Sequence, residues 1–467
     1  MDERRTAVNI VYSEATIEWL QDLFCERLGA GLSFRQQGQQ TVLSLHGELI
    51  DIRFSSDAAT FSEQGVRSLS CEWWQAENEG FSSFFAKQLP MPGSLGAALP
   101  LVRATGKNGV GGSLLVFYDI PGLTYWMLSR QEEVGRKDLD AIGRFPATSS
   151  HAYRHGYLDR PIVDEWLDIL RQVIRRVWPR FDLKQSCFQM RLSHDVDSAA
   201  RYAFLNPFRL LRRSVMDSIR QKDLTVLLRA YRARAAMRFK QELIAEDPHN
   251  TYEWLMSLSE QYDVTSEFYF ICGRTDPLKD GDYNIASPFI GGLLEEIHSR
   301  GHQIGLHPSY NSFREPDVIH QEFMRLRSVC DRRGIVQNEW PARMHYLRWR
   351  VGVTPVALEE AGIAVDATLA YADRPGFRCG TCHGYQAFDP VGKRALNLHV
   401  RPLVAMDTSV LNSGYLNKGV HDGSAFETFM ALKSACRKVD GDFSLLWHNS
   451  GLGTPELRDL YASVLNA

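Results

Sequence analysis

The stretch Gly301-His302-Gln303-Ile304-Gly305-Leu306-His307-Pro308-Ser309-Tyr310 ends a short apolar run with polar residues. The run Gln303–Leu306 has the length and composition of a buried strand, and Gly301 separates it from a helical pattern before it. Pro308 turns the chain away from the strand, because its ring fixes the backbone and it has no N–H to donate. His307 therefore stands where a strand ends, and this arrangement recurs between residues 187 and 467.

Short apolar runs alternate with helical patterns from about Cys187 onward. The strand candidates are 188–192, 266–271, 303–306, the segment around 342–346, 363–365, 395–400 and 443–447. The helix candidates include 252–261, 288–299, 322–332 and 354–361. This alternation predicts a parallel α/β sheet, and seven strands favour a distorted (β/α)7-type barrel. In such barrels the active-site residues lie at the C-terminal ends of the strands.

Residues 1–125 predict a separate, smaller α+β domain. A helical period covers 15–28, and the runs 41–45 and 50–54 flank a turn and predict a hairpin. Residues 126–185 predict a helical connector, in which Pro161 suits the first turn of a helix that follows it. The barrel domain is then expected over 186–467.

The net charge, the apolar runs and the cysteine content narrow the class of protein that this chain can be. A net charge of −3 over 467 residues gives no general attraction to nucleic acid or membranes. No apolar segment of signal-peptide type follows Met1, and no run of 18 apolar residues exists. Eight scattered cysteines favour reduced thiols over a disulfide framework. We therefore expect a cytoplasmic protein, with contact at the inner face of the membrane left open.

A basic helical insertion is expected at about 201–245, after the first strand of the barrel. Its segment 201–240 carries eleven Arg and Lys residues against Asp217 and Asp223, with Leu, Ile, Tyr and Phe between them. A solvated helical face has this composition. A surface that contacts an anionic glycan, a pyrophosphate-linked carrier or the membrane has it too, so both interpretations stay open.

Carboxylates and imidazoles follow three of the predicted strands. Asp195 and Asp197 point to the same side of a strand, and two carboxylates so close repel unless a cation or an arginine intervenes. Arg343 can form a bidentate ion pair with a carboxylate, and histidine, as at His307, is a common zinc ligand. His448 follows a buried-looking strand and can act as a general acid. These residue types together predict a metal-assisted hydrolase.

The same residues resemble the NodB-homology polysaccharide deacetylases, carbohydrate esterase family 4, over about residues 187–467. The resemblance rests on Gly-His-x-Ile-Gly-x-His at 301–307, the paired aspartates, Arg343, and Leu-Leu-x-His at 445–448. The first part resembles an uncharacterised N-terminal region fused to some bacterial members, through Gly-Arg-Phe-Pro at 143–146 and Arg-Pro-Ile-Val-Asp at 160–164.

The resemblance implies roles for the residues at the strand ends. Asp195 would be the catalytic base, with Arg343 orienting it. Asp197 and His307 would be metal ligands, and His448 would be the general acid that protonates the leaving amine. The backbone amide of Tyr310 would donate to the oxyanion, and Asp366 would be the acid that supports the catalytic pair.

One ligand departs from the family pattern. The second histidine ligand of the family falls four residues after the first, where this chain has Asn311, and an asparagine oxygen is a poor zinc ligand. His345 stands where the family has proline and is expected to supply the missing imidazole. The predicted metal site is therefore Asp197, His307 and His345, with Asn311 and His194 as alternatives for the third ligand.

The expected function is a carbohydrate N-deacetylase with zinc, or cobalt or nickel, as its cofactor. It would remove an N-acetyl or another small acyl group from a sugar or glycan in bacterial surface-polysaccharide assembly, such as lipopolysaccharide biosynthesis. No nucleic-acid partner is expected. The alternatives are a catalytically inactive glycan-binding or scaffold protein on a deacetylase fold, and a metal-independent hydrolase of small cyclic amides.

Overall fold

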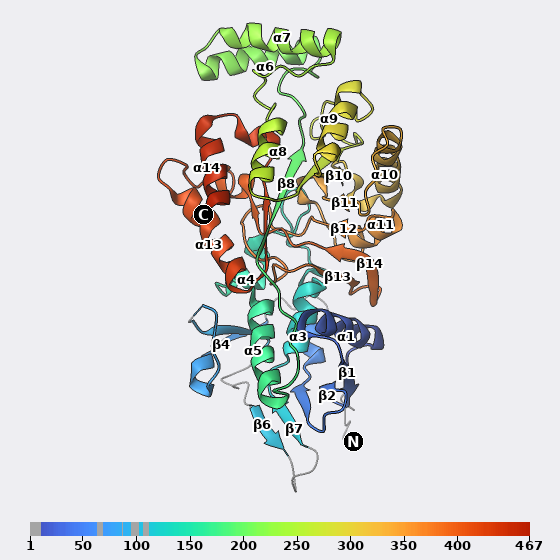
Figure 1. Cartoon of the computed structure of the whole chain (residues 1–467), viewed down its shortest axis with the longest axis vertical. Helices are drawn as coiled ribbons and strands as arrows, with labels where there is room; N and C mark the ends of the chain where they lie inside the picture. Colours follow the sequence, from blue (N-terminus) through green and yellow to red (C-terminus); the bar gives the residue numbers. More distant parts are fainter. Residues whose placement is uncertain (1–10, 63–68, 86, 95–101, 106–111) are drawn as a thin grey trace, which may run out of the picture. The chain divides into compact units, whose positions relative to one another are not determined.

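The computed structural model describes residues 11–62, 69–85, 87–94, 102–105 and 112–467 (Figure 1). Its contacts divide the chain into two compact units. Unit 1 consists of Met1–Phe188, Phe377–His399 and Ala435–Gly441. Unit 2 consists of Gln189–Gly376, Val400–Ser434 and Asp442–Ala467.

Unit 1 contains an α+β region, as the sequence predicts. Its five-stranded sheet has the order β1-β2-β3-β7-β6, and β4 pairs with β5. The strands are β1 Leu32–Gln37, β2 Gln40–Leu45, β3 Asp51–Ser55, β4 Cys71–Trp74, β5 Leu89–Pro92, β6 Val102–Thr105, β7 Ser113–Val116 and β13 Tyr385–Asp389, and β14 Arg394–Val400 begins here. The helices are α1 Glu14–Leu28, α2 Ala58–Ser62, α3 Ile120–Leu128, α4 His151–Arg154 and α5 Ile162–Val177.

Strong local patterns in unit 1 become the elements that they predict. The hairpin forms from β2 and β3, which pair antiparallel. Helix α1 begins after Ser13, whose side chain accepts a hydrogen bond from the N–H of Thr16. Helix α5 buries Trp166, which stacks on Trp74 with ring centroids 5.4 Å apart. Trp74 and Trp166 are both part of the buried core of the unit.

Seven strands of unit 2 form a parallel sheet in the order β12-β11-β10-β9-β8-β16-β15. They are β8 Gln189–Val196, β9 Ser266–Ile271, β10 Gln303–His307, β11 Pro341–Ala342, β12 Val365–Asp366, β15 Ala405–Met406 and β16 Asp442–Leu446. Strands β9, β10 and β16 are buried along nearly their whole length, which is typical of a parallel sheet covered on both faces. The predicted α/β class with a mostly parallel sheet is confirmed.

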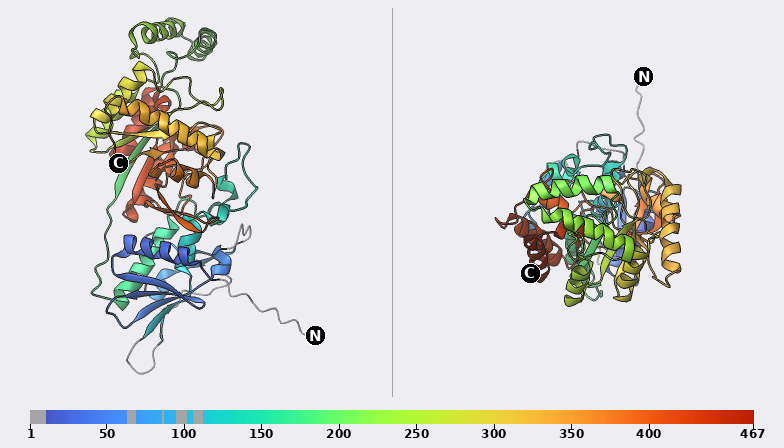
Figure 2. Two further views of the ribbon diagram at one scale, coloured as in Figure 1. Left: turned by 90° about the vertical axis from the view of Figure 1, so that its right-hand side faces the viewer. Right: turned by 90° about the horizontal axis from the view of Figure 1, so that it is seen from above.

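The helices of unit 2 connect these strands. They are α6 Pro207–Gln221, α7 Thr225–Lys240, α8 Tyr252–Gln261, α9 Pro288–Ser299, α10 Pro316–Asp331, α11 Thr354–Glu360, α12 Asp407–Leu411, α13 Ser424–Lys438 and α14 Pro455–Asn466. Helices α8 and α9 have the predicted bounds. Helices α6 and α7 lie side by side as a pair in the segment expected to be a basic insertion (Figure 2).

Three strands of unit 2 differ from the prediction. The strand expected around 342–346 covers only Pro341–Ala342. The residues after it lead into a turn at Tyr346 and Leu347, both in the left-handed region with φ of 61° and 54°. The strand expected at 363–365 shifts to β12. Strand β15 was not predicted, because two residues carry no readable period.

Candidate metal and acid–base site

The carboxyl ends of the strands in unit 2 carry the side chains that the sequence singled out. Asp195 lies beside the last residue of strand β8, and His307 ends β10. Arg343 follows β11, and His448 follows β16. Because all neighbouring strands are parallel, these ends share one edge of the sheet, which is where open α/β sheets place their ligands.

Asp195 and Arg343 form a buried ion pair. Arg343 Nη1 donates to Asp195 Oδ1 at 2.8 Å, and both side chains are 3% exposed. Arg343 Nε donates to the carbonyl of Ala367 at 3.0 Å, and its guanidinium lies 4.4 Å from the ring centroid of Tyr269. These contacts fix the carboxylate, whose Oδ2 lies 3.8 Å from His307 Nε2.

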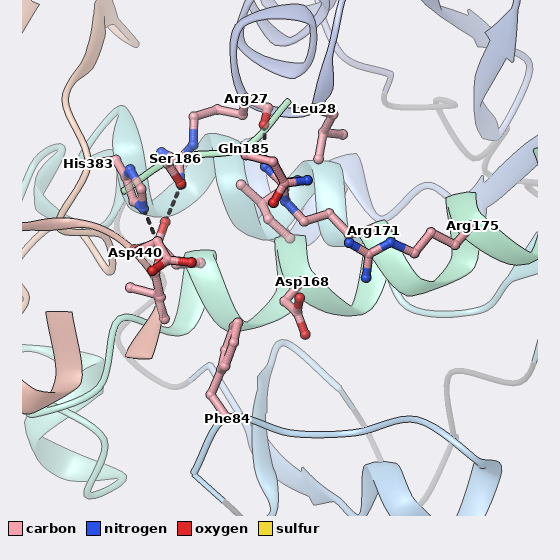
Figure 3. A pocket seen from close by; sticks show the side chains of 13 residues that line it. Arg27, Leu28, Phe84, Asp168, Arg171, Arg175, Gln185, Ser186, His383 and Asp440 are labelled. Carbon is pink, nitrogen blue, oxygen red and sulfur yellow. Dashed lines mark hydrogen bonds and ion pairs between the residues drawn. The ribbon is translucent and has the colours of Figure 1, made fainter. Parts of the chain in front are cut away.

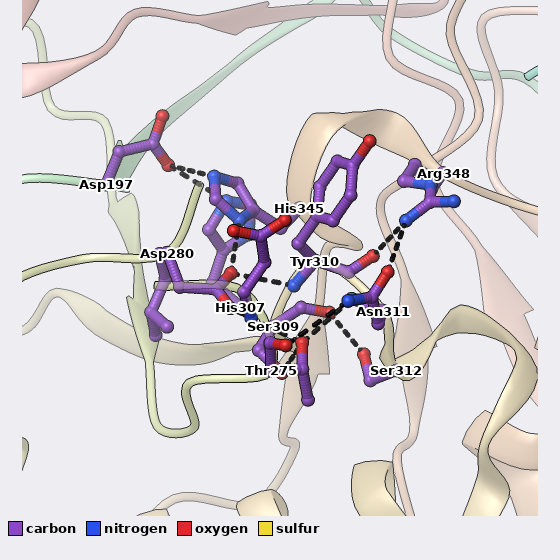
Figure 4. A network of polar contacts seen from close by, with 12 residues as sticks. Asp197, Thr275, Asp280, His307, Ser309, Tyr310, Asn311, Ser312, His345 and Arg348 are labelled. Atoms are coloured by element: carbon purple, nitrogen blue, oxygen red, sulfur yellow. Dashed lines mark hydrogen bonds and ion pairs between the residues drawn. The ribbon is translucent and has the colours of Figure 1, made fainter. Parts of the chain in front are cut away.

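Asp197, His307 and His345 converge beside this pair (Figure 4). Each offers one ligand atom, and the three atoms lie within 4.8 Å of one another. His307 Nε2 is 3.1 Å from Asp197 Oδ1, and His345 Nε2 is 3.4 Å from the same oxygen. Two ligands of a tetrahedral zinc ion, at bonds of about 2.0–2.1 Å, are about 3.3 Å apart. The spacing therefore fits a small divalent ion.

The far nitrogens of both rings are held by partners that aim Nε2 at Asp197. His307 Nδ1 lies 2.5 Å from the carbonyl of Arg343, so it donates there. His345 Nδ1 lies 3.0 Å from Asp280 Oδ1, and that carboxylate also accepts the Tyr310 N–H at 2.7 Å. Carbonyl and carboxylate partners of this kind orient ligand histidines in metal sites and set their tautomer.

The ionisable side chains of the cluster stabilise one another's charged forms. Burial opposes the charge on Asp197, but the His345 imidazolium and the hydrogen bond from His307 outweigh it and hold the pKa of that carboxyl well below its usual range. Burial lowers the pKa of His345, while Asp197 and Asp280 raise it to about 9. A positive charge thus already sits among these carboxylates, and an ion that takes its place must displace the proton of His345.

His448 lies on the other side of Asp197 with its own carboxylate. His448 Nδ1 is 2.8 Å from Asp407 Oδ1, and the His448 N–H donates to Asp407 Oδ2 at 3.1 Å. Its Nε2 is 3.7 Å from Asp197 Oδ2. Burial lowers the pKa of His448, but Asp407 and then Asp197 raise it to about 10. The ring is therefore protonated at neutral pH and can give up a proton from Nε2.

The two alternatives for the third ligand lie elsewhere. The Asn311 side-chain oxygen accepts from Arg348 at 3.2 Å, and its amide donates to the Thr275 carbonyl at 3.3 Å (Figure 4). His194 lies on β8 with its ring 4.8 Å from that of Phe268, and its Nδ1 bonds the Trp447 carbonyl at 2.8 Å. His345 is thus the residue that joins Asp197 and His307.

Two further predicted residues have structural contacts. The Tyr310 N–H, expected to donate to an oxyanion, is engaged by Asp280 and so helps to hold that carboxylate. Asp366 accepts hydrogen bonds from Trp349 Nε1 and the Thr368 N–H, both at 2.9 Å. It therefore fixes the loop after β12, whose Ala367 carbonyl holds Arg343.

Sequence reasoning missed two carboxylates of the site. Asp407 follows the apolar run 402–406, which is the same signal that identifies His307 and His448. This residue could therefore have been predicted from the sequence. Asp280 lies in the loop between β9 and α9, which has no period, and no signal in the sequence points to it.

Two other groups of potential ligands are already satisfied by the protein. Asp164, grouped with Cys382 and His383, pairs with Arg27 at 2.5 Å and accepts from Thr381 at 2.7 Å. In the group of Cys71, His151 and His155, one His151 nitrogen bonds the Tyr157 hydroxyl and the other bonds the Leu69 carbonyl at 3.1 Å. Burial also raises the pKa of Cys71 to about 12, which disfavours a thiolate ligand.

A cavity of about 180 Å³ in unit 1 is lined by charged side chains (Figure 3). Arg171, on α5, donates to the carbonyls of Lys184 at 2.7 Å and Arg27 at 2.6 Å, while Arg27 pairs with Asp164. These arginines hold the backbone of the unit together, and the cavity carries no acid–base pair comparable to that of unit 2 among the residues described.

Residues 11–179 match the model of a family of unknown function, DUF7033. No curated protein matches the chain. A solved structure described as "Crystal structure of putative polysaccharide deacetylase from Mycobacterium smegmatis" is 14% identical, with a TM-score of 0.39, over 61% of this chain and 84% of that chain. No helix in the described part of the chain has the length and apolar character needed to cross a membrane.

Proposed function

We propose that this chain is a metal-dependent hydrolase that removes an N-acetyl or another small acyl group from a sugar in bacterial surface-polysaccharide assembly. The observation that carries the proposal is the convergence of Asp197, His307 and His345, with both rings already oriented by partners on their far nitrogens. Zinc suits this donor set, and cobalt or nickel are alternatives.

A divalent ion held by these three side chains would supply a Lewis acid, which lowers the pKa of a bound water from about 15.7 to about 7 and polarises the acyl carbonyl. The protein supplies the proton transfers. Asp195 lies beside the ligand group, and we assign to it the removal of a proton from the attacking water. Arg343 fixes its direction, so that the carboxylate needs no reorganisation during the reaction.

His448 is assigned the return of a proton to the leaving nitrogen. The water oxygen bonds to the acyl carbon, the C–N bond breaks, and the nitrogen takes the proton from His448 Nε2. Asp407 supports this step because it holds Nδ1 and keeps the ring protonated. The products are a carboxylic acid and an amino sugar.

The lack of a histidine at position 311 favours the inactive glycan-binding alternative. The position of His345 argues against it, since an imidazole occupies the third corner of the group without a histidine at 311. The retained acid and base, each paired with its own charged partner, argue the same way.

The test is release of acetate from N-acetylated amino-sugar oligomers by the zinc-loaded chain. Asp195→Asn should lower kcat by about 10²–10⁴-fold, the contribution of a general base, while bound zinc stays near the wild-type amount. Asp197→Ala should lose zinc and turnover together. Undiminished turnover in Asp195→Asn would remove the base, and undiminished turnover in chelator would favour the metal-independent hydrolase.

A further inference from the structure

Helices α6 and α7 expose an unusual set of large apolar side chains. Phe208 is 76% exposed, Ile219 72%, Leu224 79% and Phe239 80%. The exposed set on the two helices, together with Leu224 at the N-cap of α7, is Phe208, Leu211, Val215, Met216, Ile219, Leu224, Leu227, Leu228, Tyr231 and Phe239. Side chains scattered singly would need no explanation, but ten on one helical pair form a surface that water disfavours.

The exposed side chains form one stripe on each helix. On α6 they recur at 208, 211, 215 and 219, with Met216 beside them, and on α7 at 227, 228, 231 and 239, with Leu224 directly before the first residue of the helix. This is close to the spacing of a single helical face. The opposite face of the pair is already partnered, because Leu210 packs with Ala230 and Ala233 in a buried cluster. The outer stripes are therefore not needed to hold the two helices together.

Positive charge flanks the stripes. Residues 207–240 contain ten Arg and Lys against two Asp. Both acids are neutralised, since Asp217 pairs with Arg201 at 2.6 Å and Asp223 with Arg229 at 3.0 Å. Arg212, Arg213 and Arg220 have no ion-pair partner within the described ranges. The free charge on this surface is thus almost entirely positive.

We propose that the α6–α7 pair lies flat on an anionic lipid bilayer. Apolar stripes with basic flanks on helices too short to span are the pattern of interfacial membrane binding, with the apolar side chains among the acyl chains and the cations at the headgroups. A second copy of this chain fits less well, since it would bring a second surface of the same positive charge against the first. Anionic headgroups complement that charge.

The pair is anchored close to the candidate site. Arg209 Nη1 donates to Asp282 Oδ1 at 2.5 Å. A cavity of about 440 Å³ lies between α6 and the loop that joins β9 to α9. Asp280, which holds His345, is part of its lining. A bilayer-bound chain would carry the site at the membrane surface. If the proposed function holds, the substrate is a membrane-borne glycan. Only this last step depends on the proposed function.

Vesicle binding tests the docking without reference to activity. The full chain is sedimented with phosphatidylcholine vesicles, with and without about a third phosphatidylglycerol. We expect at least about tenfold tighter binding to the anionic vesicles, weakened by 0.5 M salt as surface charge is screened. Ile219→Ser/Phe239→Ser should lose at least about tenfold in affinity, and Arg212→Gln/Arg220→Gln should lose the preference for phosphatidylglycerol.

The matched control is Met324→Ser/Val336→Ser, which removes two exposed apolar side chains elsewhere in unit 2 and should bind as wild type. Three results would overturn the proposal. One is no binding of the wild-type chain to anionic vesicles. Another is equal loss of binding in the control. The last is a dimer in light scattering that Ile219→Ser/Phe239→Ser converts to monomer without changing vesicle binding, which would assign the stripes to a second copy.

Discussion

Asp407 controls the protonation of His448 through one hydrogen bond. It is the largest favourable cause of the high pKa of that ring, about 10, because a carboxylate 2.8 Å away stabilises the imidazolium. A raised pKa means that the acid form persists through neutral pH and is lost only as the pH rises toward 10. Activity should therefore have a basic limb set by this residue.

The change Asp407→Asn should move that limb to lower pH. The amide keeps a hydrogen bond but removes the negative charge, so the pKa of His448 falls and turnover is lost at a lower pH than in wild type. We expect kcat at pH 8 to fall by about 10²-fold or more, the lower end for a general acid. The measurement is kcat against pH, and an unshifted basic limb would show that His448 is not the acid.

The change Asp280→Asn should weaken metal binding without removing a ligand. Asp280 holds His345 through Nδ1, and partners of this kind contribute about 10–100-fold in metal affinity. Competition with a zinc chelator measures the loss. Asn311→Ala is the control, because that side chain contacts Arg348 and Thr275 instead. Equal affinities for Asp280→Asn and wild type would contradict the assignment of His345 as a ligand.

Single residues of the site were predictable where they follow a readable strand. His307 and His448 end buried apolar runs, so their positions at the sheet edge follow from the sequence. Asp280 was not predictable, because a long loop brings it to His345 and loop geometry leaves no period. Even the third ligand was left open among His345, Asn311 and His194, since only tertiary structure shows which ring faces Asp197.

Packing between neighbouring strands positions the base. Gly305 on β10 lies opposite Tyr269 on β9, and a Cβ at Gly305 would lie 2.5 Å from the Tyr269 ring and 3.0 Å from the Pro341 carbonyl. Arg343 rests on that ring. The glycine in the strand thus makes room for the side chain that supports Arg343, and through it Asp195.

The change Gly305→Ala should affect stability and turnover together. Tyr269 is fully buried and cannot move aside, so we expect a loss of about 1–3 kcal/mol, as for other overpacked cores. Gly292→Ala, in helix α9 with open space around its Cβ, should be neutral or stabilising by up to about 1 kcal/mol. Urea unfolding measures both. Equal free energies of unfolding for Gly305→Ala and Gly292→Ala would show that β9 and β10 can accommodate the added methyl group, and would contradict the tight packing argued for Gly305.

Element prediction was most accurate for helices with clear apolar spacing and least accurate for short strands. Helices α8 and α9 have the bounds that their apolar spacing predicts, whereas α10, predicted over 322–332, begins earlier, at Pro316. Strands β11, β12 and β15 have two residues each, and loops form most of the chain around them. The strand predicted around Ala342–Tyr346 is therefore shorter than expected, and its predicted C-terminal end is a left-handed turn at Tyr346.

The stability of the whole chain should fall in mild acid through buried neutral histidines. Burial lowers the pKa of His151 in unit 1 to about 3, far below its value of about 6.5 in an unfolded chain. Folding is therefore favoured above pH 6.5, and this contribution is lost as the pH falls from 6.5 toward 3, by up to about 1.4 kcal/mol per pH unit.

The change His151→Gln should flatten this dependence. The free energy of urea unfolding is measured at pH 7 and pH 5 for wild type, for His151→Gln and for His320→Gln, an exposed control. We expect the wild type and the control to lose stability alike, and His151→Gln to lose about 2 kcal/mol less between these pH values. Parallel slopes for all three proteins would show that His151 is not held neutral.

The central claim is that Asp197, His307 and His345 hold one metal ion. It is tested most directly by elemental analysis of the full chain purified without chelator and reloaded with zinc, beside His307→Ala, His345→Ala and Asn311→Ala. The account predicts about one zinc per chain in wild type and Asn311→Ala, and its loss in the two histidine variants. No bound metal in the wild-type chain, or full retention in His345→Ala, would contradict it.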